Sequence, residues 1–330
     1  MMIQMIEKAD RFRHGVVGSL LCLFLCMASW AQAASSLKPD PIDEESYGES
    51  FTAVAEFEDG SYVLLQYVFT NAGFGDGKAA CRALIVPPGG KGKNSAIKVD
   101  RDEWSYNAGS NSLNVGKCVL KSSGNQTRFV AKTGEVTASL KLNAGIRSLR
   151  TPGHRIKSDG KFYESEILVP WATATATLST GGKVWKINGH GYLDHTRSNA
   201  LLKNLANRWI RFRGFRGTSP VLFEVRYPPR GAYKAWIWSD GKARPIKGGN
   251  IKTKGKSSSL SIALQTDKGA AQIKARKVIY RYKPAKQYGL LGRLAKPWVG
   301  DPEIITSQAE LTLGDGSVVK GVLEEARFAD

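Results

Sequence analysis

The chain has 330 residues and a strong excess of basic side chains, with 48 lysines and arginines against 29 acidic residues and a net charge of +19. This length allows two domains or one large β domain. The charge favours contact with anionic surfaces such as lipid head groups, lipopolysaccharide or acidic polymers, although it would also keep a β-rich protein soluble. The sequence has no CxxC or HxxxH spacing, which argues against metal ligation and leaves no predicted cofactor.

Residues 1–33 have the pattern of a secretory signal peptide. A basic region at residues 8–13 precedes an apolar run at residues 16–30, which is too short for a membrane span, and residues 31–33 form an A-x-A cleavage site. We therefore expect an exported, periplasmic protein whose mature chain begins at Ala34. The alternative is an uncleaved anchor helix. Cleavage would remove three basic and two acidic residues and leave a net charge of +18.

Cleavage would also leave Cys81 and Cys118 as the only cysteines of the mature chain. An even pair in an oxidising compartment predicts a disulfide, which would contribute about 3 to 4 kcal/mol by restricting the unfolded chain. The alternative is two buried free thiols.

The first half of the mature chain reads as a series of short strands separated by Gly, Asn, Asp and Pro turns. Its close spacing is typical of an all-β sandwich or barrel. Pro170 cannot donate to a strand ladder, so we expect a bend or bulge there. Residues 71–78 are glycine-rich but lack the ending of a phosphate loop, which favours a flexible loop. The predicted strands are residues 51–57, 61–69, 80–86, 115–120, 128–131, 136–142, 163–170, 172–177 and 183–195.

A second series of strands follows a short predicted helix. Residues 242–256 are polar and basic and predict a mobile loop, whereas residues 288–298 have helix-like apolar spacing. The two halves have similar strand counts and meet near residue 204, which gives predicted domains of residues 34–203 and 204–330. The predicted strands of the second half are residues 209–215, 221–227, 233–238, 260–265, 272–282, 304–313 and 318–328.

Residues 189–215, where the two halves join, hold the densest group of chemically active side chains. On a strand, Tyr192 and Asp194 share one face and His195 lies on the other, so Asp194 and His195 cannot form a dyad without a bulge. We hypothesise that His195 projects into a barrel cavity; the alternative is that it caps the short helix or pairs with a backbone carbonyl as a satisfied core polar group. Ser198 is a candidate N-cap for the linking helix, whose apolar face would be Leu201, Leu202, Leu205 and Ala206.

The next strand carries Trp209, Arg211, Arg213 and Phe215 on one face. This mixture could hold an anionic head group beside an apolar chain, or it could be an outer face with arginines packed over Trp209. Glu164 and Glu166 also share a strand face, and they are either an acid and base pair or a solvated face. Without a serine elbow, a zinc motif or a carboxylate pair at catalytic spacing, an enzyme with this sequence would act through shape and a few polar groups.

Four segments carry a resemblance to a known family. Residues 50–66, the GHGYLDH element at 189–195, residues 206–215 and residues 313–328 resemble the fungal oxidative-stress survival-factor family. The GYxDH element also resembles the superfamily of hydroxyneurosporene synthase-type carotenoid hydratases and lipocalin-like Diels-Alderases. This resemblance implies two consecutive lipocalin-like (calycin) antiparallel β-barrels, the first ending with the GYLDH strand, and a short linking helix.

The resemblance also implies a hydrophobic ligand, since its members carry ceramide-type sphingolipids or act on polyenes and terpenoids. Two departures stand out. An export signal replaces the membrane-binding N-terminal helix of the fungal proteins, and residues 196–198 replace the Trp-Gly that follows the histidine in the hydratases. Tyr192, His195 and Trp209 match the family pattern by position, and Arg211 shares a face with Trp209, so these four residues are the predicted ligand site.

The main hypothesis is an exported lipocalin-like protein that binds and transfers a ceramide-type lipid. Its basic segments at residues 242–256 and 274–286 would touch anionic membranes. The alternative is a cofactor-independent hydratase, isomerase or cyclase of a polyene or terpenoid, in which His195 or Asp194 moves a proton. A third hypothesis is a basic envelope protein with filled barrels. Nucleic acid is not an expected partner, because the signal peptide directs the chain out of the cell.

Overall fold

The computed structural model describes residues 36–71, 77–158, 160–217, 219–229, 234–283 and 302–328, and these residues belong to one compact unit. The described secondary structure is almost entirely antiparallel β, with one short helix, α2 (Leu202–Leu205), and three 3-10 turns. This confirms the predicted all-β fold and the linking helix. The helix starts later than expected: Ser198 ends a strand and donates to Phe162 O (2.8 Å), so it is not the N-cap.

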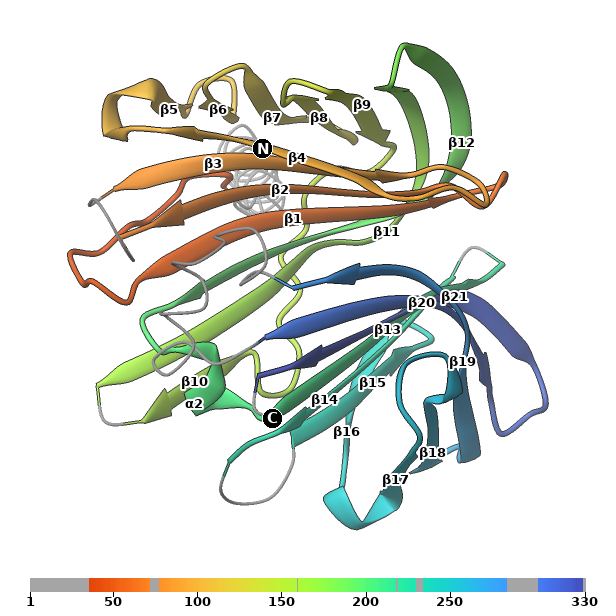
Figure 1. Ribbon diagram of the computed structural model, residues 1–330. Helices are drawn as coiled ribbons and strands as arrows, with labels where there is room; N and C mark the ends of the chain where they lie inside the picture. The colour runs from red at the N-terminus through yellow and green to blue at the C-terminus, as the bar shows by residue number, and fades with distance from the viewer. Residues whose placement is uncertain are drawn as a thin grey trace, which may run out of the picture. The chain divides into compact units, whose positions relative to one another are not determined.

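The first sheet curls into a nearly closed barrel. Its strands follow the order β4-β3-β2-β1-β12-β11-β9-β8-β7-β6-β5, and β10 pairs with β11 off this path (Figure 1). The strand bounds are β1 (Gly48–Phe57), β2 (Tyr62–Thr70), β3 (Lys78–Val86), β4 (Lys93–Val99), β5 (Trp104–Asn107), β6 (Ser112–Val115), β7 (Cys118–Ser123), β8 (Gln126–Lys132), β9 (Val136–Leu142), β10 (Arg155–Ser158), β11 (Lys161–Thr180) and β12 (Lys183–Ser198).

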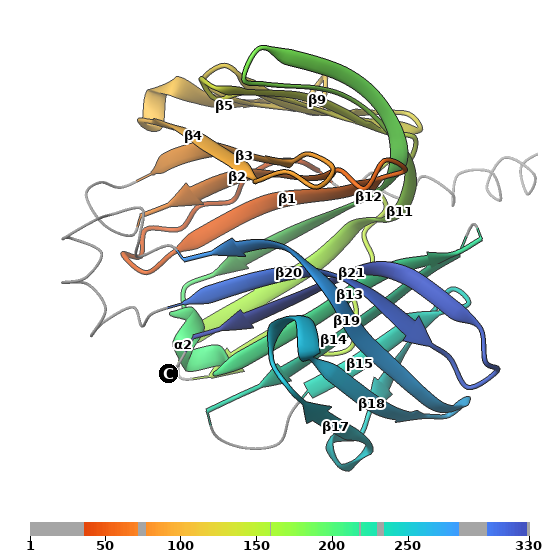
Figure 2. The same cartoon turned by 45° about the vertical axis from the view of Figure 1, so that its right-hand side comes forward.

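The second sheet forms another nearly closed barrel, with the strand order β16-β15-β14-β13-β21-β20-β19-β18-β17. Figure 2 shows α2 where the chain passes from β12 to β13. The strand bounds are β13 (Arg208–Arg216), β14 (Ser219–Tyr227), β15 (Lys234–Ser239), β16 (Lys242–Ile246), β17 (Ile251–Lys254), β18 (Ser261–Thr266), β19 (Gly269–Tyr282), β20 (Glu303–Thr312) and β21 (Val318–Arg327).

Each barrel has its own apolar core, built by the period-two alternation of its strands. Phe51 and Leu193 belong to the core of the first barrel, and Ile210, Phe212 and Phe223 to that of the second. All five side chains are at most 1 % exposed. The residues that alternate with them on β12 and β13 therefore face away from the barrel interiors, and these outward faces build the site described below.

The expected disulfide between Cys81 and Cys118 is present, with an S–S distance of 2.13 Å. Cys81 lies on β3 and Cys118 on β7, and both are fully buried in the first core. The bond links two strands that are not neighbours in the sheet, so it ties opposite parts of the first barrel together.

Several predicted strand boundaries need correction. Residues 163–170 and 172–177 belong to one strand, β11, although the bulge expected near Pro170 is present as register shifts on both sides of Val169. Residues 115–120 contain the turn between β6 and β7, where Gly116 has φ +53°. Residues 242–256 are not a loop: they contain β16 and β17, held by the buried Ile246 and Ile251. The predicted helix at 288–298 and residues 72–76 lie outside the described residues.

Candidate functional site

The outward faces of β12 and β13 meet where the two barrels touch. The Arg213 guanidinium carbon lies 4.7 Å from the centre of the Tyr192 ring, and the His190 and Phe215 ring centroids are 4.8 Å apart. All four of these residues lie within residues 189–215, so this stretch folds back on itself. Strands β1, β11 and β12 lie toward β13, β20 and β21 in both views (Figures 1 and 2).

An apolar cluster surrounds these contacts and contains side chains of both barrels. Tyr192 and Ile167 from the first barrel pack with Leu222 and Trp236 from the second, and all four are at most 7 % exposed. The other buried members are Val54, Tyr62, Leu84, Val86 and Val322. The cluster excludes water and lowers the local dielectric, which strengthens electrostatic interactions between the charged groups beside it.

Six charged side chains gather within this apolar surround, and we call them the inter-barrel charge cluster: Asp194, Arg211, Arg213, Glu224, Arg226 and Glu324. Asp194 Oδ2 lies 3.7 Å from Arg211 Nη1 and 3.7 Å from Arg213 Nη2. Glu224 lies 3.2 Å from Arg211 Nε and 2.6 Å from Arg226 Nη2. Glu324 is farther from the arginines, at 3.9 to 4.0 Å. The three carboxylates and three guanidiniums balance in formal charge.

The two best-buried carboxylates of this cluster respond differently to their surroundings. Burial raises the pKa of Asp194 above its ordinary value, and the attraction of Arg211 and Arg213 offsets this only in part. Burial also acts to raise the pKa of Glu224, but the close Arg226 and Arg211 lower it overall. Asp194 is therefore the group of this pair that can carry a proton nearer neutral pH. Burial likewise raises the pKa of Tyr192 well above 10.0.

Trp209 and Arg211, two of the predicted ligand residues, lie in this same region. Arg211 stacks over the Trp209 ring at 4.3 Å, Arg226 covers the ring at 4.2 Å, and Tyr163 meets it edge-on at 5.0 Å. Arg211 Nη2 also donates to the Tyr163 hydroxyl (3.2 Å). The arginines thus pack over Trp209 within the barrel contact rather than on a free outer face.

The structure does not bring His195 to the other predicted ligand residues. His195 lies on the opposite face of β12, stacked on Phe51 with ring centroids 4.2 Å apart. Its Nε2 atom lies 2.6 Å from Glu49 Oε1, and the Tyr47 hydroxyl and Asp40 N–H donate to Glu49 Oε2 at 2.7 and 2.9 Å. His195 is therefore held by a side-chain carboxylate at one end of the first core, and not by a backbone carbonyl or the end of the helix.

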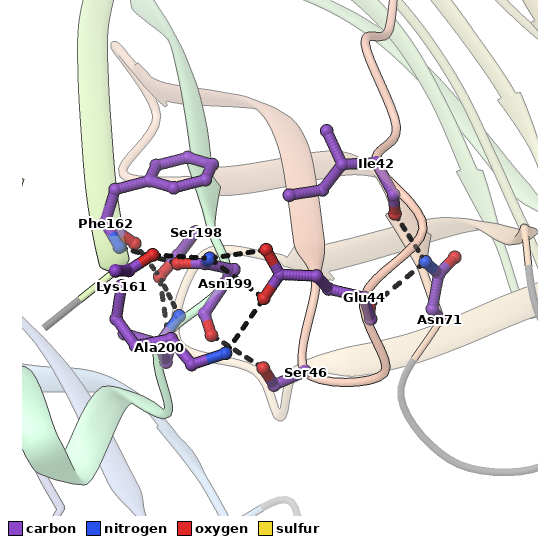
Figure 3. Close-up of polar contacts among 10 residues, drawn as sticks. Ile42, Glu44, Ser46, Asn71, Lys161, Phe162, Ser198, Asn199 and Ala200 are labelled. Carbon is purple, nitrogen blue, oxygen red and sulfur yellow. Dashed lines mark hydrogen bonds and ion pairs between the residues drawn. The ribbon is translucent and has the colours of Figure 1, made fainter.

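Residues 36–47, which we call the N-terminal segment, pack against this end of the first barrel. Leu37 is fully buried, and Glu44 is the main polar anchor. The Glu44 carboxylate accepts hydrogen bonds from Asn199 Nδ2 (2.9 and 3.0 Å) and Lys161 Nζ (2.8 Å), as Figure 3 shows. Ser46 Oγ donates to Asn199 O at 2.6 Å. These bonds attach the N-terminal segment to β11 and to the residues that precede α2.

Other candidate groups are engaged in ion pairs. Glu164 pairs with Arg155 (2.5 Å) and Arg197 (2.8 Å), and Glu166 pairs with Arg150 (2.6 Å), so neither is a free acid or base. Among the described residues, no group of three or more His, Cys, Asp or Glu side chains is arranged to hold a metal. None of the described helical segments has the length and apolar character of a transmembrane helix.

A cavity of about 220 Å³ lies at the turn end of the second barrel, away from the inter-barrel charge cluster. Its rim charges pair with one another: Arg216 with Asp240 (2.5 Å) and Asp315 (3.3 Å), and Lys268 with Asp240 (2.5 Å). We place the candidate site at Asp194 because its side chain is only 3 % exposed, whereas those of Asp240 and Asp315 at this cavity are 36 % and 60 % exposed.

Sequence reasoning missed Glu224, Arg226 and Glu324. A signal for Glu224 was present in the turn residue Gly217, because a hairpin in which Ser219 pairs with Arg216 places Glu224 directly opposite Arg211. Glu324 lies opposite Arg211 on the other neighbouring strand, β21. That pairing joins strands more than a hundred residues apart in the chain, so local sequence patterns could not predict it.

Comparison with known proteins finds similarity in architecture but not in sequence. No family model and no curated protein sequence matches it. A provisionally named AttH of Nitrosomonas europaea superposes with a TM-score of 0.59 at 11 % identity, covering 90 % of this chain and 99 % of the other. Kievitone hydratase from Nectria haematococca gives 0.57 at 10 % identity, covering 86 % and 89 %. The likeness is one of fold.

CghA has the same architecture. Its TM-score is 0.55 at 12 % identity, covering 90 % of this chain and 94 % of CghA. A second CghA structure, with Sch210972, matches with the same TM-score and identity. The tandem barrels therefore resemble an AttH-type fold that is shared with a hydratase and with a protein crystallised with a small molecule.

Proposed function

We propose that this protein is a cofactor-independent enzyme that binds a hydrophobic small molecule where the two barrels meet and transfers a proton through Asp194. The observation that supports this proposal is the burial of the Asp194 carboxyl group, which is 2 % exposed and lies 3.7 Å from one nitrogen atom of each of two arginines. A carboxyl group with a raised pKa in an apolar surround is suited to act as a general acid. Hydration, isomerisation and cyclisation of an alkene can each begin with protonation of the double bond by such a group.

In a hydration, the Asp194 carboxyl would give its proton to one carbon of a substrate double bond. Water would then add to the other carbon, and the proton that it loses would return to the Asp194 carboxylate. The apolar cluster around Tyr192 and Trp236 would hold the carbon skeleton. Arg213 Nη1 and Trp236 Nε1 are buried without a hydrogen-bond partner among the described residues, so they could donate to a substrate oxygen.

The fold comparisons support the reaction class. Kievitone hydratase is by its name a hydratase, and CghA has been crystallised with Sch210972. The GYxDH element also resembles that of carotenoid hydratases, which add water to a double bond. Access to Asp194 would be from the side of Arg211 and Glu324, whose side chains are each 18 % exposed and are the most open members of the inter-barrel charge cluster.

Transport of a ceramide-type lipid in the periplasm, as in the survival-factor resemblance, is a second candidate function. Three exposed lysines favour it: Lys252 and Lys254 on β17, and Lys274 on β19. Lys254 and Lys274 both lie opposite Ser261 on the intervening strand β18, and none of the three lysines has an ion-pair partner among the described residues. Such a basic sheet face would suit an anionic membrane surface.

The deciding experiment compares turnover in D194N with turnover in the wild-type protein. The mature protein would be incubated in D2O with acyclic polyenes and terpenoid alkenes, and deuterium incorporation into product measured by mass spectrometry. We expect D194N to lose about a hundredfold or more in rate, because the general acid is removed. D102N is the matched control, since Asp102 is exposed and distant in sequence. H195Q should retain turnover, because His195 faces the other side of β12.

Equal rates in D194N and wild type would overturn the assignment to Asp194. A carrier would give a different result: stoichiometric lipid in native mass spectra of protein taken from its own envelope, no turnover of any substrate, and lipid content unchanged in D194N.

A further inference from the structure

The three carboxylates of the inter-barrel charge cluster do not share the arginines equally. Glu224 has the two shortest contacts, 2.6 Å to Arg226 and 3.2 Å to Arg211. Asp194 reaches Arg211 and Arg213 only at 3.7 Å, beyond hydrogen-bond distance. Arg211 therefore lies nearer to Glu224 than to Asp194, although its Nε atom has no hydrogen-bond partner among the described residues. Asp194 receives no direct hydrogen bond from this guanidinium.

The strand register explains why Glu224 prevails. Glu224 lies directly opposite Arg211 in the β13–β14 ladder, and Arg226 follows two residues later on the same face of β14. Asp194 belongs to the other sheet and approaches Arg211 only across the barrel contact. Arg226 is fixed in its turn, since its Nη1 donates to Gly153 O (3.2 Å) and its guanidinium lies over Tyr163 (4.7 Å).

We propose that Glu224 is a positioning residue that holds Arg211 away from Asp194 and so preserves the ability of Asp194 to carry a proton. This inference rests on the proposed function of Asp194 as the general acid. The titratable and charged groups that act directly on Asp194 are Tyr192 on its own strand, Arg211 and Arg213 on β13 and Glu324 on β21. Glu224 on β14 and Tyr163 on β11 contact Arg211. Among the carboxylates, Glu224 has the closest contact with Arg211.

Removal of the Glu224 charge would act on Asp194 in one direction. Arg211 would be released to approach Asp194, and a negative charge would leave the neighbourhood of Asp194. Both changes favour the ionised form of Asp194. If one Arg211 contact shortened from 3.7 Å to hydrogen-bond distance, the titration midpoint of Asp194 would fall by about one pH unit at an effective dielectric of 20.

The test is a direct titration of Asp194 in E224Q. Infrared spectra of protein labelled with 13C-carboxyl aspartate, with D194N as the reference that identifies the Asp194 band, would follow its protonation from pH 3 to pH 9. We expect a midpoint about one pH unit lower in E224Q than in wild type. E224D should lie between the two, because it keeps the charge on a shorter side chain. E310Q, a surface carboxylate that pairs with Arg276, is the matched control and should leave the midpoint unchanged.

A second variant, R226Q, tests the same proposal without depending on the folding of E224Q. In R226Q, Glu224 would lose its closest partner and rely on Arg211 alone, so the Asp194 midpoint should stay at or above the wild-type value. A lowered midpoint in E224Q together with an unchanged or raised midpoint in R226Q would support the positioning role. An unchanged or raised midpoint in E224Q, or a lowered one in R226Q, would overturn it.

Turnover provides a separate readout. A general acid must be protonated, so activity falls as the pH rises through its pKa, and this alkaline limb should move to lower pH in E224Q by the same amount as the titration midpoint. The titration itself needs no substrate. A shifted midpoint together with full turnover in D194N would therefore retain the role of Glu224 while rejecting Asp194 as the catalytic acid.

Discussion

The Arg213 guanidinium lies 4.7 Å above the Tyr192 ring and joins a strand of one barrel to a strand of the other. Tyr192 is on β12 and Arg213 on β13, and only α2 and its flanking residues separate the two strands in the chain. The same arginine approaches Asp194 and Glu324. One side chain thus couples the aromatic and the charged parts of the barrel contact.

Replacement of Arg213 should weaken this contact, and the loss of stability should be larger for R213M than for R213K. R213M removes the charge and leaves Asp194 and Glu324 with one fewer buried partner, so we expect a loss of about 3 kcal/mol in the free energy of unfolding. R213K keeps the charge over Tyr192 but not the planar guanidinium, and should lose about 1 kcal/mol. Urea denaturation would measure both variants. R128M, at an exposed position on β8, is the control, and an R213M protein as stable as R128M would contradict the prediction.

Alternation along single strands could be predicted from sequence, whereas contacts between distant strands could not. The two-residue repeat of a β-strand was enough to place Tyr192 and Asp194 on one face and Leu193 and His195 on the other, and the structure has this arrangement. The partners of Asp194 depend on how the two sheets pack, and no local pattern encodes that packing. His195 illustrates the limit, because its partner Glu49 is 146 residues away in the chain.

Residues 242–256 show a second limit of sequence reasoning. Their glycines, lysines and proline are typical of a loop, yet β16 and β17 form there because Ile246 and Ile251 are buried in the second core. Two apolar side chains in a basic segment are a weak local signal. Their packing against the rest of the barrel outweighs the loop-like composition.

The disulfide between Cys81 and Cys118 should contribute much of the stability of the first barrel. The two residues are 37 positions apart, so the bond restricts a long loop of the unfolded chain by about 4 kcal/mol. We expect the C81S/C118S double variant to lose about this amount in guanidinium denaturation. Wild-type protein unfolded in the presence of a reductant should match it. Equal stability of the double variant and the oxidised wild type would show that the bond does not constrain the unfolded chain.

The close approach of β1 and β12 should depend on Gly189. A Cβ atom there would overlap the carbonyl oxygen of Glu56 and lie 2.7 Å from Phe57 Cα, so the strands would have to separate. We expect G189A to lose about 3 kcal/mol in stability. G48A is the matched control on the same strand pair, because a Cβ at Gly48 meets no atom within 4 Å. A thermal melt in which both variants unfold at the same temperature would refute the steric argument.

The N-terminal segment should loosen when Glu49 loses its charge. The Glu49 carboxylate accepts hydrogen bonds from Tyr47 and from the Asp40 backbone and pairs with His195, so it joins the segment to β12. E49Q weakens these charge-assisted bonds, with an expected cost of about 2 kcal/mol. Hydrogen exchange followed by mass spectrometry should show faster exchange in residues 37–47. E45Q, at an exposed neighbouring position, should exchange as wild type does, and the prediction fails if E49Q does so too.

Stability should fall in acid partly through Glu325. Its side chain is 2 % exposed and pairs with Arg208 (2.6 Å) and Arg327 (2.8 Å). Burial acts to raise the pKa of Glu325, but Arg327 and Arg208 lower it below its ordinary 4.5. A carboxyl group whose pKa is lower in the folded state stabilises the fold above its unfolded-state pKa, and this contribution is lost as the pH falls through the folded-state pKa.

E325Q should therefore be less stable than wild type by about 3 kcal/mol at pH 7, because it leaves Arg208 and Arg327 without their carboxylate. The difference should hold down to about pH 5 and then shrink as wild-type Glu325 becomes protonated. Urea denaturation at pH 7, 5, 4 and 3 would follow it. E310Q, whose carboxylate is 32 % exposed, should differ from wild type by less than about 1 kcal/mol throughout. If the difference in the free energy of unfolding between E325Q and wild type stays constant down to pH 3, the lost stability comes from packing rather than from the charge of Glu325.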